Sequence, residues 1–145
     1  MKIVYIAGPY RGKNAAEVER NIRTAQRYAM ALTQAGIAVY SPHLNTAHFD
    51  GLQPDQFFLD LGLEMLRRCD ALVIAGGGWE KSDGTRREVK DARMLGMIVA
   101  EMRGIGGFVD GYQVMNITET SEPIIPLPAW ANWFLALPPR RVEVG

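Results

Sequence analysis

Short runs of consecutive hydrophobic residues alternate along this chain with longer stretches in which hydrophobic residues recur every three or four positions. The short runs have the length and composition of buried strands, and they cover residues 2–7, 37–40, 71–75 and 97–100. The longer stretches have the period of amphipathic helices, and they cover residues 14–36, 54–68 and 79–96. Because strands and helices alternate, the pattern predicts an α/β fold, a three-layer Rossmann-like or flavodoxin-like parallel sheet with helices on both faces.

The first predicted helix carries signals at both ends. Asn14 is a predicted N-cap, because its side chain can accept a hydrogen bond from a free N–H of the first turn. Gly36 is the predicted stop, because glycine commonly ends a helix in a left-handed conformation.

The C-terminal part of the chain is rich in glycine and proline. We expect a domain of residues 1–103 followed by an extension of residues 104–145. Within the extension, residues 130–134 predict one turn of apolar helix between two prolines. Its aromatic side chains must be covered by the domain or by a partner chain, and we favour a contact with a partner subunit.

Length and composition limit the functional classes. A chain of 145 residues suits a single domain with a real hydrophobic core. Sixteen acidic and sixteen basic residues balance, which argues against binding to polymeric nucleic acid but leaves room for a small anionic ligand. The single cysteine, Cys69, excludes an internal disulfide and a Cys-rich metal site, and its position before a strand predicts a core residue. No apolar run has the length of a membrane span or signal peptide, so we expect a soluble cytoplasmic protein.

Glu88 is the residue with the strongest chemical signal. It leads the apolar stripe of the third predicted helix, where burial of an unpaired carboxylate would cost several kcal/mol. The helix follows a strand and the glycines of residues 76–78, an arrangement whose backbone N–H groups and dipole attract anions. A second interpretation is a capping box from Thr85 to Glu88, and this motif alone favours capping over catalysis.

Two further loops lie at predicted carboxyl ends of strands, where open α/β sheets bind ligands. Residues 8–12 combine two glycines, which allow close approach of a ligand, with Arg11, which can pair with a phosphate. An ordinary turn with a solvated arginine fits these residues equally well. Residues 41–48 hold both histidines, His43 and His48, without a nearby acidic partner, so a polar loop facing substrate or a plain surface is favoured over a metal site.

Four sequence pieces, in this order and spacing, resemble the nucleoside 2-deoxyribosyltransferase-like superfamily over about residues 2 to 101. They are Gly8-Pro9-Tyr10-Arg11-Gly12 after a strand, Ser41-Pro42-His43, Leu66-Arg67-Arg68-Cys69-Asp70-Ala71 before a strand, and Trp79-Glu80-x-Ser82-x-Gly84-x-x-x-Glu88. The superfamily includes nucleoside deoxyribosyltransferases, nucleotide N-hydrolases and short bacterial and phage proteins, and this chain resembles the last group most.

The resemblance implies roles for individual residues. Glu88 falls on the nucleophile that attacks the anomeric carbon and forms a glycosyl-enzyme ester, and Tyr5 falls on a tyrosine near it. Ser82 falls where the nucleotide hydrolases carry a phosphate-contacting serine and the transferases an aspartate, which favours a 5′-phosphorylated substrate. The residues expected to bind substrate are Gly8, Pro9, Tyr10, Arg11, Gly12, His43, Asn45, Asp70, Ser82, Gly84 and Thr85, although a purely structural role at the strand entry is favoured for Asp70.

One position departs from the superfamily. Its enzymes carry an aspartate, thought to protonate the leaving base, eight residues before the position of Asp70, and this chain has Gly62 there. Loss of that acid would lower the rate by about 10²- to 10⁴-fold. Asp60 is the candidate substitute, but two residues along a helix turn a side chain by about 200°.

The resulting hypothesis is an N-glycosidase that cleaves the base–sugar bond of a (deoxy)nucleoside 5′-monophosphate, with Glu88, Asp60 and Tyr5 as catalytic residues. Alternatives are a deoxyribosyltransferase that exchanges bases, a nucleotide-binding sensor with weak catalysis, and a phosphoribohydrolase, whose glycine motif this chain matches imperfectly. The chemistry needs no cofactor or metal. The resemblance also implies a homodimer or larger homo-oligomer, because the superfamily usually completes its pocket with a neighbouring subunit.

Overall fold

A computed structural model describes residues 1–109, 112–119 and 125–140 of the chain. The strands are β1 (Ile3–Ala7), β2 (Ala38–Tyr40), β3 (Ala71–Ala75), β4 (Ile98–Val109), β5 (Tyr112–Glu119) and β6 (Ile125–Pro126). They form one sheet in the order β2-β1-β3-β4-β5-β6. The first four strands are parallel to their neighbours, whereas β5 and β6 are added in antiparallel pairs. The predicted α/β fold with four parallel strands is confirmed.

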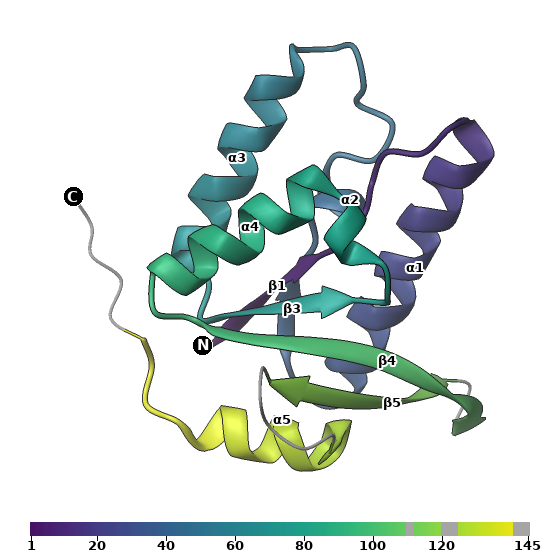
Figure 1. The fold of residues 1–145 in the computed structure, drawn as a ribbon. Coiled ribbons are helices and arrows are strands. Elements are labelled where there is room, and N and C mark those ends of the chain that lie inside the picture. Colours follow the sequence, from purple (N-terminus) through teal and green to yellow (C-terminus); the bar gives the residue numbers. More distant parts are fainter. Residues whose placement is uncertain (110–111, 120–124, 141–145) are drawn as a thin grey trace.

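Helices cover both faces of the sheet (Figure 1). They are α1 (Ala15–Gln34), α2 (Pro42–Asn45), α3 (Asp55–Arg68), α4 (Asp83–Met94) and α5 (Leu127–Ala136), with a short 3-10 helix, η1 (Trp79–Lys81), before α4. Helices α3 and α4 lie side by side on one face, and α1 and α5 pack on the other. The predicted loop of residues 41–48 contains α2, which the sequence did not indicate.

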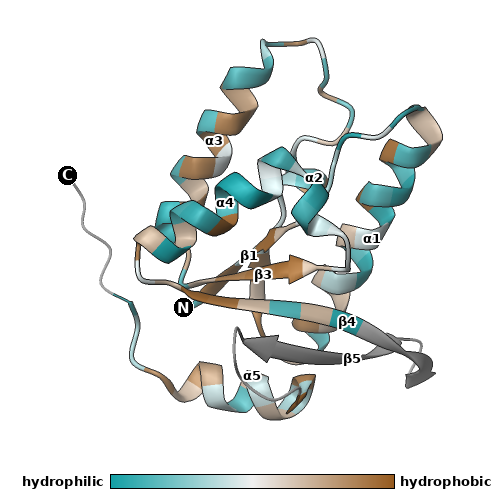
Figure 2. Cartoon of the chain, viewed as in Figure 1, coloured by the Kyte–Doolittle hydropathy of each residue, from teal (hydrophilic) through white to brown (hydrophobic). Residues whose placement is uncertain are grey.

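The central strands are buried on both faces, which explains why they are continuously hydrophobic (Figure 2). Along β1, Val4 and Ile6 point into the core beneath α1 and α5, whereas Tyr5 and Ala7 point into the core beneath α3 and α4. This alternation places the Tyr5 side chain in the layer that α3 and α4 cover.

The predicted helix signals at the start of the chain are confirmed. The Asn14 side chain accepts a hydrogen bond from the Glu17 N–H at 2.9 Å, and α1 follows directly. Gly36 has a φ of 88°, which a residue with a side chain adopts only with strain. None of the helices in the described part of the chain combines the length and hydrophobicity needed to cross a bilayer.

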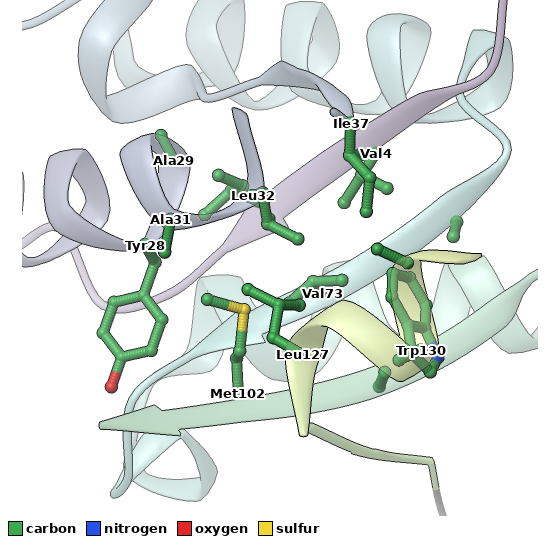
Figure 3. Packing of buried hydrophobic residues seen from close by; sticks show 14 of the residues in the cluster. Val4, Tyr28, Ala29, Ala31, Leu32, Ile37, Val73, Met102, Leu127 and Trp130 are labelled. Atoms are coloured by element: carbon green, nitrogen blue, oxygen red, sulfur yellow. The ribbon is translucent and has the colours of Figure 1, made fainter. Parts of the chain in front are cut away.

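The C-terminal segment continues the sheet and the core. Strand β4 extends beyond the predicted residues 97–100 to Val109 and pairs with β5. Helix α5 is longer than the single turn predicted, and its Trp130 and Phe134 are each 1% exposed. Figure 3 shows Leu127 and Trp130 in the cluster that includes Val4, Val73 and Met102. These two aromatic side chains are therefore covered within the chain, and the favoured contact with a partner subunit is wrong for them; Trp133 is 45% exposed.

Candidate active site

Helix α4 begins at the carboxyl end of β3, after a turn in which Gly76 and Gly78 adopt positive φ angles of 86° and 78°. Its N-cap is Ser82, whose Oγ accepts hydrogen bonds from the Thr85 N–H at 3.3 Å and the Thr85 hydroxyl at 3.0 Å. Thr85 is 1% exposed and lies inside the helix. The interpretation of Thr85 as the cap and Glu88 as its capping-box partner is therefore wrong.

Glu88 lies in the middle of α4, and its carboxylate is turned inward. The side chain is half-buried, and its Oε2 is enclosed without a hydrogen-bond partner among the described residues. The Tyr5 hydroxyl donates a hydrogen bond to the same carboxylate. Tyr5 is itself 1% exposed, so the phenol and the carboxylate form a pair at the boundary between β1 and α4. A helix cap or a solvated surface residue does not explain this placement.

Burial dominates the electrostatics of the pair. It raises the pKa of Glu88 from 4.5 to about 7; the Tyr5 hydrogen bond acts in the opposite direction, and the charge of Asp91 adds to the rise. Burial, together with the Glu88 carboxylate, also raises the pKa of Tyr5 far above its ordinary value. The carboxylate therefore titrates near neutral pH, whereas the phenol keeps its proton.

The raised pKa predicts a stability that depends on pH. Between about pH 4.5 and 7 the folded chain holds the Glu88 proton more tightly than the unfolded chain, so Glu88 makes the free energy of unfolding fall as pH rises. The loss across this window is roughly 3 kcal/mol, and it levels off above pH 7. Urea unfolding of the native protein and of Glu88→Gln at pH 5 and pH 8 measures it. The variant should gain on the native protein at pH 8, and an equal difference at both pH values would contradict the prediction.

Two glycines lie close to the pair, one on α3 and one on α4. A Cβ built on Gly62 of α3 would meet the Tyr5 hydroxyl oxygen at 3.0 Å and no other atom within 4 Å. A Cβ built on Gly84, one helical turn before Glu88 on the same side of α4, would meet nothing within 4 Å. The surface beside Gly84 is therefore open, whereas the Tyr5 hydroxyl leaves little space beside Gly62.

Tyr40 and Asn45 extend the site along the carboxyl edge of the sheet. The Tyr40 ring lies 5.7 Å from the Tyr5 ring, between centroids, and the Asn45 amide donates to the Tyr40 hydroxyl at 3.3 Å. Asn45 was predicted to bind substrate, and the structure places it one contact away from Tyr5. Sequence analysis missed Tyr40, whose one signal is its place at the end of a strand, where side chains face the ligand edge.

The loop after β1 is held by α1 and α2. The His43 Nε2–H donates to the Pro9 carbonyl at 2.9 Å, and the His43 and Tyr10 rings meet edge-on, with centroids 5.5 Å apart. From α1, Asn21 donates to the Tyr10 carbonyl at 3.0 Å. Burial lowers the pKa of His43, so the ring is neutral and its role is to position Pro9. Asn21 was missed by sequence analysis because a polar residue on a helix resembles a solvated one.

Several predicted site residues lie elsewhere. Asp60 is exposed and accepts a hydrogen bond from Gln56 at 2.7 Å, on the side of α3 opposite Gly62. The Asp70 Oδ2 accepts from the Ile3 N–H at 2.8 Å, at the amino edge of the sheet, which fits the structural role. The Arg11 guanidinium is exposed and pairs with Asp55, and Gly12 lies against the Glu17 side chain.

His48 also lies outside the pair's surroundings. Its Nε2 lies 3.3 Å from a Glu19 carboxylate oxygen on the surface of α1. Within residues 1–109, 112–119 and 125–140, no group of three or more His, Cys, Asp or Glu side chains is arranged to hold a metal ion.

Two surface pockets lie away from Glu88. One, of about 510 Å³, lies along the outer side of α4 and is lined by Trp79, Glu80, Arg86, Val89, Lys90, Arg93 and Met94. The other, of about 410 Å³, lies at the amino edge of the sheet beside α5 and is lined by Met1, Lys2, Gly36, Ala38, Leu135 and Pro139. Neither pocket includes Tyr5 or Glu88, so neither is the crevice predicted in front of the carboxylate.

Comparisons with known proteins define the fold. A family model described as "Domain of unknown function (DUF7768)" matches residues 2–102. No curated protein matches the chain significantly. The structure is similar to that of a 2-deoxyribosyltransferase from Bacillus psychrosaccharolyticus, with a TM-score of 0.51, 23% identity, and coverage of 67% of this chain and 69% of that one. It is also similar to a 2-deoxyribosyltransferase from Leishmania mexicana, with a TM-score of 0.51, 18% identity, and coverage of 78% and 77%.

Proposed function

This chain belongs to the DUF7768 family, a domain of unknown function, and from its site we propose that it is an N-glycosidase. Its substrate would be a nucleoside 5′-monophosphate with ribose or deoxyribose, and it would cleave the bond between base and sugar. The observation that carries the proposal is the buried Glu88 carboxylate, which is turned toward Tyr5 and has one oxygen without a hydrogen-bond partner in the described part of the chain. Burial of such a carboxylate lowers the stability of the folded protein, so a buried carboxylate of this kind usually has a function.

Glu88 would act as the nucleophile. Its carboxylate attacks the anomeric carbon, the bond from that carbon to the base nitrogen breaks, and a glycosyl ester forms on Glu88. Water then attacks the same carbon, the ester bond to Glu88 breaks, and its electron pair returns to the carboxylate. The proton that water loses balances the proton that the departing base takes up. The Tyr5 hydrogen bond stabilises the ionised form of Glu88 against the effect of burial, so it maintains a reactive fraction near neutral pH.

The start of α4 would hold the 5′-phosphate. Ser82 and the first N–H groups of α4 lie about 9 Å along the helix from Glu88, at 1.5 Å per residue. Helix N–H groups and the positive end of the dipole favour a dianion there, and the absent side chain of Gly84 leaves the approach open. A phosphate at this end and an anomeric carbon at Glu88 would place one nucleotide along the first turns of the helix.

The direct test is release of free base. The protein is incubated separately with each ribo- and deoxyribonucleoside 5′-monophosphate, and base is followed by chromatography. Release that needs Glu88 supports the proposal, and the absence of release from every nucleotide contradicts it. Incubation with a second free base separates hydrolysis from transfer, since a transferase yields a new nucleotide. Transfer is the second candidate because the two similar structures are 2-deoxyribosyltransferases.

Ser82→Asp should discriminate against phosphorylated substrates. Aspartate is also a good N-cap, so α4 should keep its start. A carboxylate about 4 Å from a phosphate would repel it by several kcal/mol, and we expect kcat/KM for monophosphates to fall by about 10²-fold or more. Plain nucleosides should lose far less. Ser82→Asn, which caps the helix without a charge, is the matched control, and equal losses for both substrate types would remove the phosphate from this end of α4.

A neighbouring subunit would complete the site. Neither of the two pockets described above includes Glu88, so neither forms the substrate cavity expected in front of the carboxylate. We therefore propose a homodimer or larger homo-oligomer in which the second copy covers the substrate. Sedimentation of the protein with and without nucleotide measures this, and a monomer that cleaves nucleotides at full rate would exclude it.

A further inference from the structure

The residue of α3 that lies against the Tyr5 hydroxyl is a glycine and has no side chain. Gly62 is buried, and a Cβ added to it would lie 3.0 Å from the Tyr5 hydroxyl oxygen, while the neighbouring α3 side chains of the same core, such as Leu66, are apolar. The acidic residues nearby on the same helix, Asp60 and Glu64, are turned outward, the first bonded to Gln56 and the second to Arg67. No carboxyl group of α3 therefore reaches the space in front of Glu88.

The other elements around Glu88 offer no ready acid either. From β1, the Tyr5 proton is committed to the hydrogen bond with Glu88, and its burial makes the phenol a very weak acid. On α4 itself, Asp91 lies one turn nearer the amino edge of the sheet, away from Gly84 and the ligand edge. From α2, the His43 Nε2–H is committed to the Pro9 carbonyl. From β2, the Tyr40 hydroxyl accepts a hydrogen bond from Asn45, and burial raises its pKa, so it is a weaker acid than an ordinary phenol. Among the described residues, a departing neutral base would therefore find no carboxyl or imidazolium group poised to protonate it.

The uncompensated negative charge of Glu88 also favours a cationic substrate. The enclosed Oε2 of Glu88 has no hydrogen-bond partner, and the ion pairs in the described part of the chain do not include Glu88. A buried carboxylate without a cation beside it is stabilised by a ligand that brings a positive charge. A cationic substrate would therefore bind against the ionised form of Glu88, which is the reactive form.

We propose that this site takes N-glycosides whose leaving heterocycle already carries a positive charge, such as a pyridinium or an N7-alkylated purine attached to a ribosyl or deoxyribosyl 5′-phosphate. The proposal rests on the proposed function of Glu88 as nucleophile. A Glu88 oxygen bonds to the anomeric carbon, the bond to the ring nitrogen breaks, and its electron pair neutralises the heterocycle, which leaves without gaining a proton. Water then attacks the anomeric carbon, the ester bond to Glu88 breaks with return of its electron pair, and the proton of water passes to solvent.

The test compares 7-methylguanosine 5′-monophosphate with guanosine 5′-monophosphate, and the two deoxy counterparts, at pH 8. Because the methylated base leaves more easily without any enzyme, each rate is divided by its spontaneous rate. We expect this enhancement to be about 10²-fold larger for the cationic substrate, the size of effect that a missing acid produces. Nicotinamide mononucleotide should be cleaved as well. Equal enhancements with Glu88-dependent cleavage of both nucleotides would overturn this inference and leave the proposed function standing, whereas no cleavage of any substrate would overturn both.

Position 62 provides a matched pair of variants. Gly62→Asp restores an acid beside Tyr5, and Gly62→Asn adds the same volume without one, with Tyr5 required to shift in both. We expect the preference for the cationic substrate to narrow by about 10-fold or more in the Asp variant and to persist in the Asn variant. An equal change in both would assign the preference to space rather than to proton donation. If neither variant folds, the pH profile of the native protein decides. Without an acid catalyst, kcat/KM should rise as Glu88 ionises and then stay level. A fall of kcat/KM at high pH would reveal an acid catalyst and overturn the inference.

Discussion

Replacement of Glu88 by glutamine should lower kcat/KM for base release by about 10³-fold or more, because an amide cannot form the glycosyl ester. Glutamine has nearly the same shape, so it fills the space beside Tyr5 and can still accept the Tyr5 hydrogen bond. Since a buried, unpartnered carboxylate oxygen is removed, the variant should be at least as stable as the native protein. A large loss of activity without loss of stability distinguishes a catalytic carboxylate from a structural one.

The measurement is free base formed per enzyme at several nucleotide concentrations, with urea unfolding of the same preparations. Glu64→Gln is the control, because Glu64 is an exposed carboxylate on the neighbouring helix whose partners are Arg67 and Arg68. It should keep the native rate. Should Glu88→Gln also keep it, Glu88 would have no part in the chemistry, and the buried carboxylate would need another explanation.

The order of strands and helices could be predicted because burial on both faces imposes a pattern that local sequence records. Residues 71–75 are hydrophobic without interruption, and β3 is buried at every position. Asn14 and Gly36 also act locally, through a cap and a left-handed turn, and both were predicted. The antiparallel pairing of β4 with β5 was not, because the glycines after residue 103 are typical of loops and only the tertiary pairing makes a strand of them.

The candidate site was also predicted only in part, because local sequence shows which residues can cap a helix but not which of them does so in the folded chain. Ser82 and Thr85 are both residue types that cap helices, and local sequence alone favoured Thr85 because Glu88 follows it at the spacing of a capping box. The choice between them is tertiary, since Thr85 packs at 1% exposure and Ser82 remains at the surface edge. Because Ser82 is the cap, Glu88 has no role in a capping box, and its carboxylate contacts Tyr5.

Helix geometry did anticipate the outcome at α3. A turn of about 200° separates Asp60 from the position of Gly62, and the structure places Asp60 outward and Gly62 against Tyr5. A bulge in the helix could have changed this, which is why the sequence alone left Asp60 as a candidate. Asp60 is therefore not among the residues that we propose for catalysis, and the absent side chain at position 62 becomes the feature that selects the substrate.

Trp130→Ala should lower the free energy of unfolding by about 3–5 kcal/mol, the usual cost of truncating a fully buried tryptophan. Trp130 is 1% exposed, and its ring stacks on the Phe134 ring with centroids 4.9 Å apart and planes 6° from parallel. It belongs to the same cluster as Val4, Leu32 and Ile37, so its removal leaves a cavity between α5 and the sheet (Figure 3). Urea unfolding should remain a single cooperative transition, and its midpoint should be lower than that of the native protein.

Trp133→Ala is the matched control, because Trp133 lies three residues further along α5 and is 45% exposed. Its truncation should cost less than about 1 kcal/mol if the exposed side chain stays in water. Equal losses for the two variants would mean that α5 does not dock through Trp130. If the urea midpoint of Trp133→Ala lies below the native midpoint only at high protein concentration, a subunit contact is located at Trp133. Association stabilises the folded native chain by mass action, and the variant would lack that stabilisation.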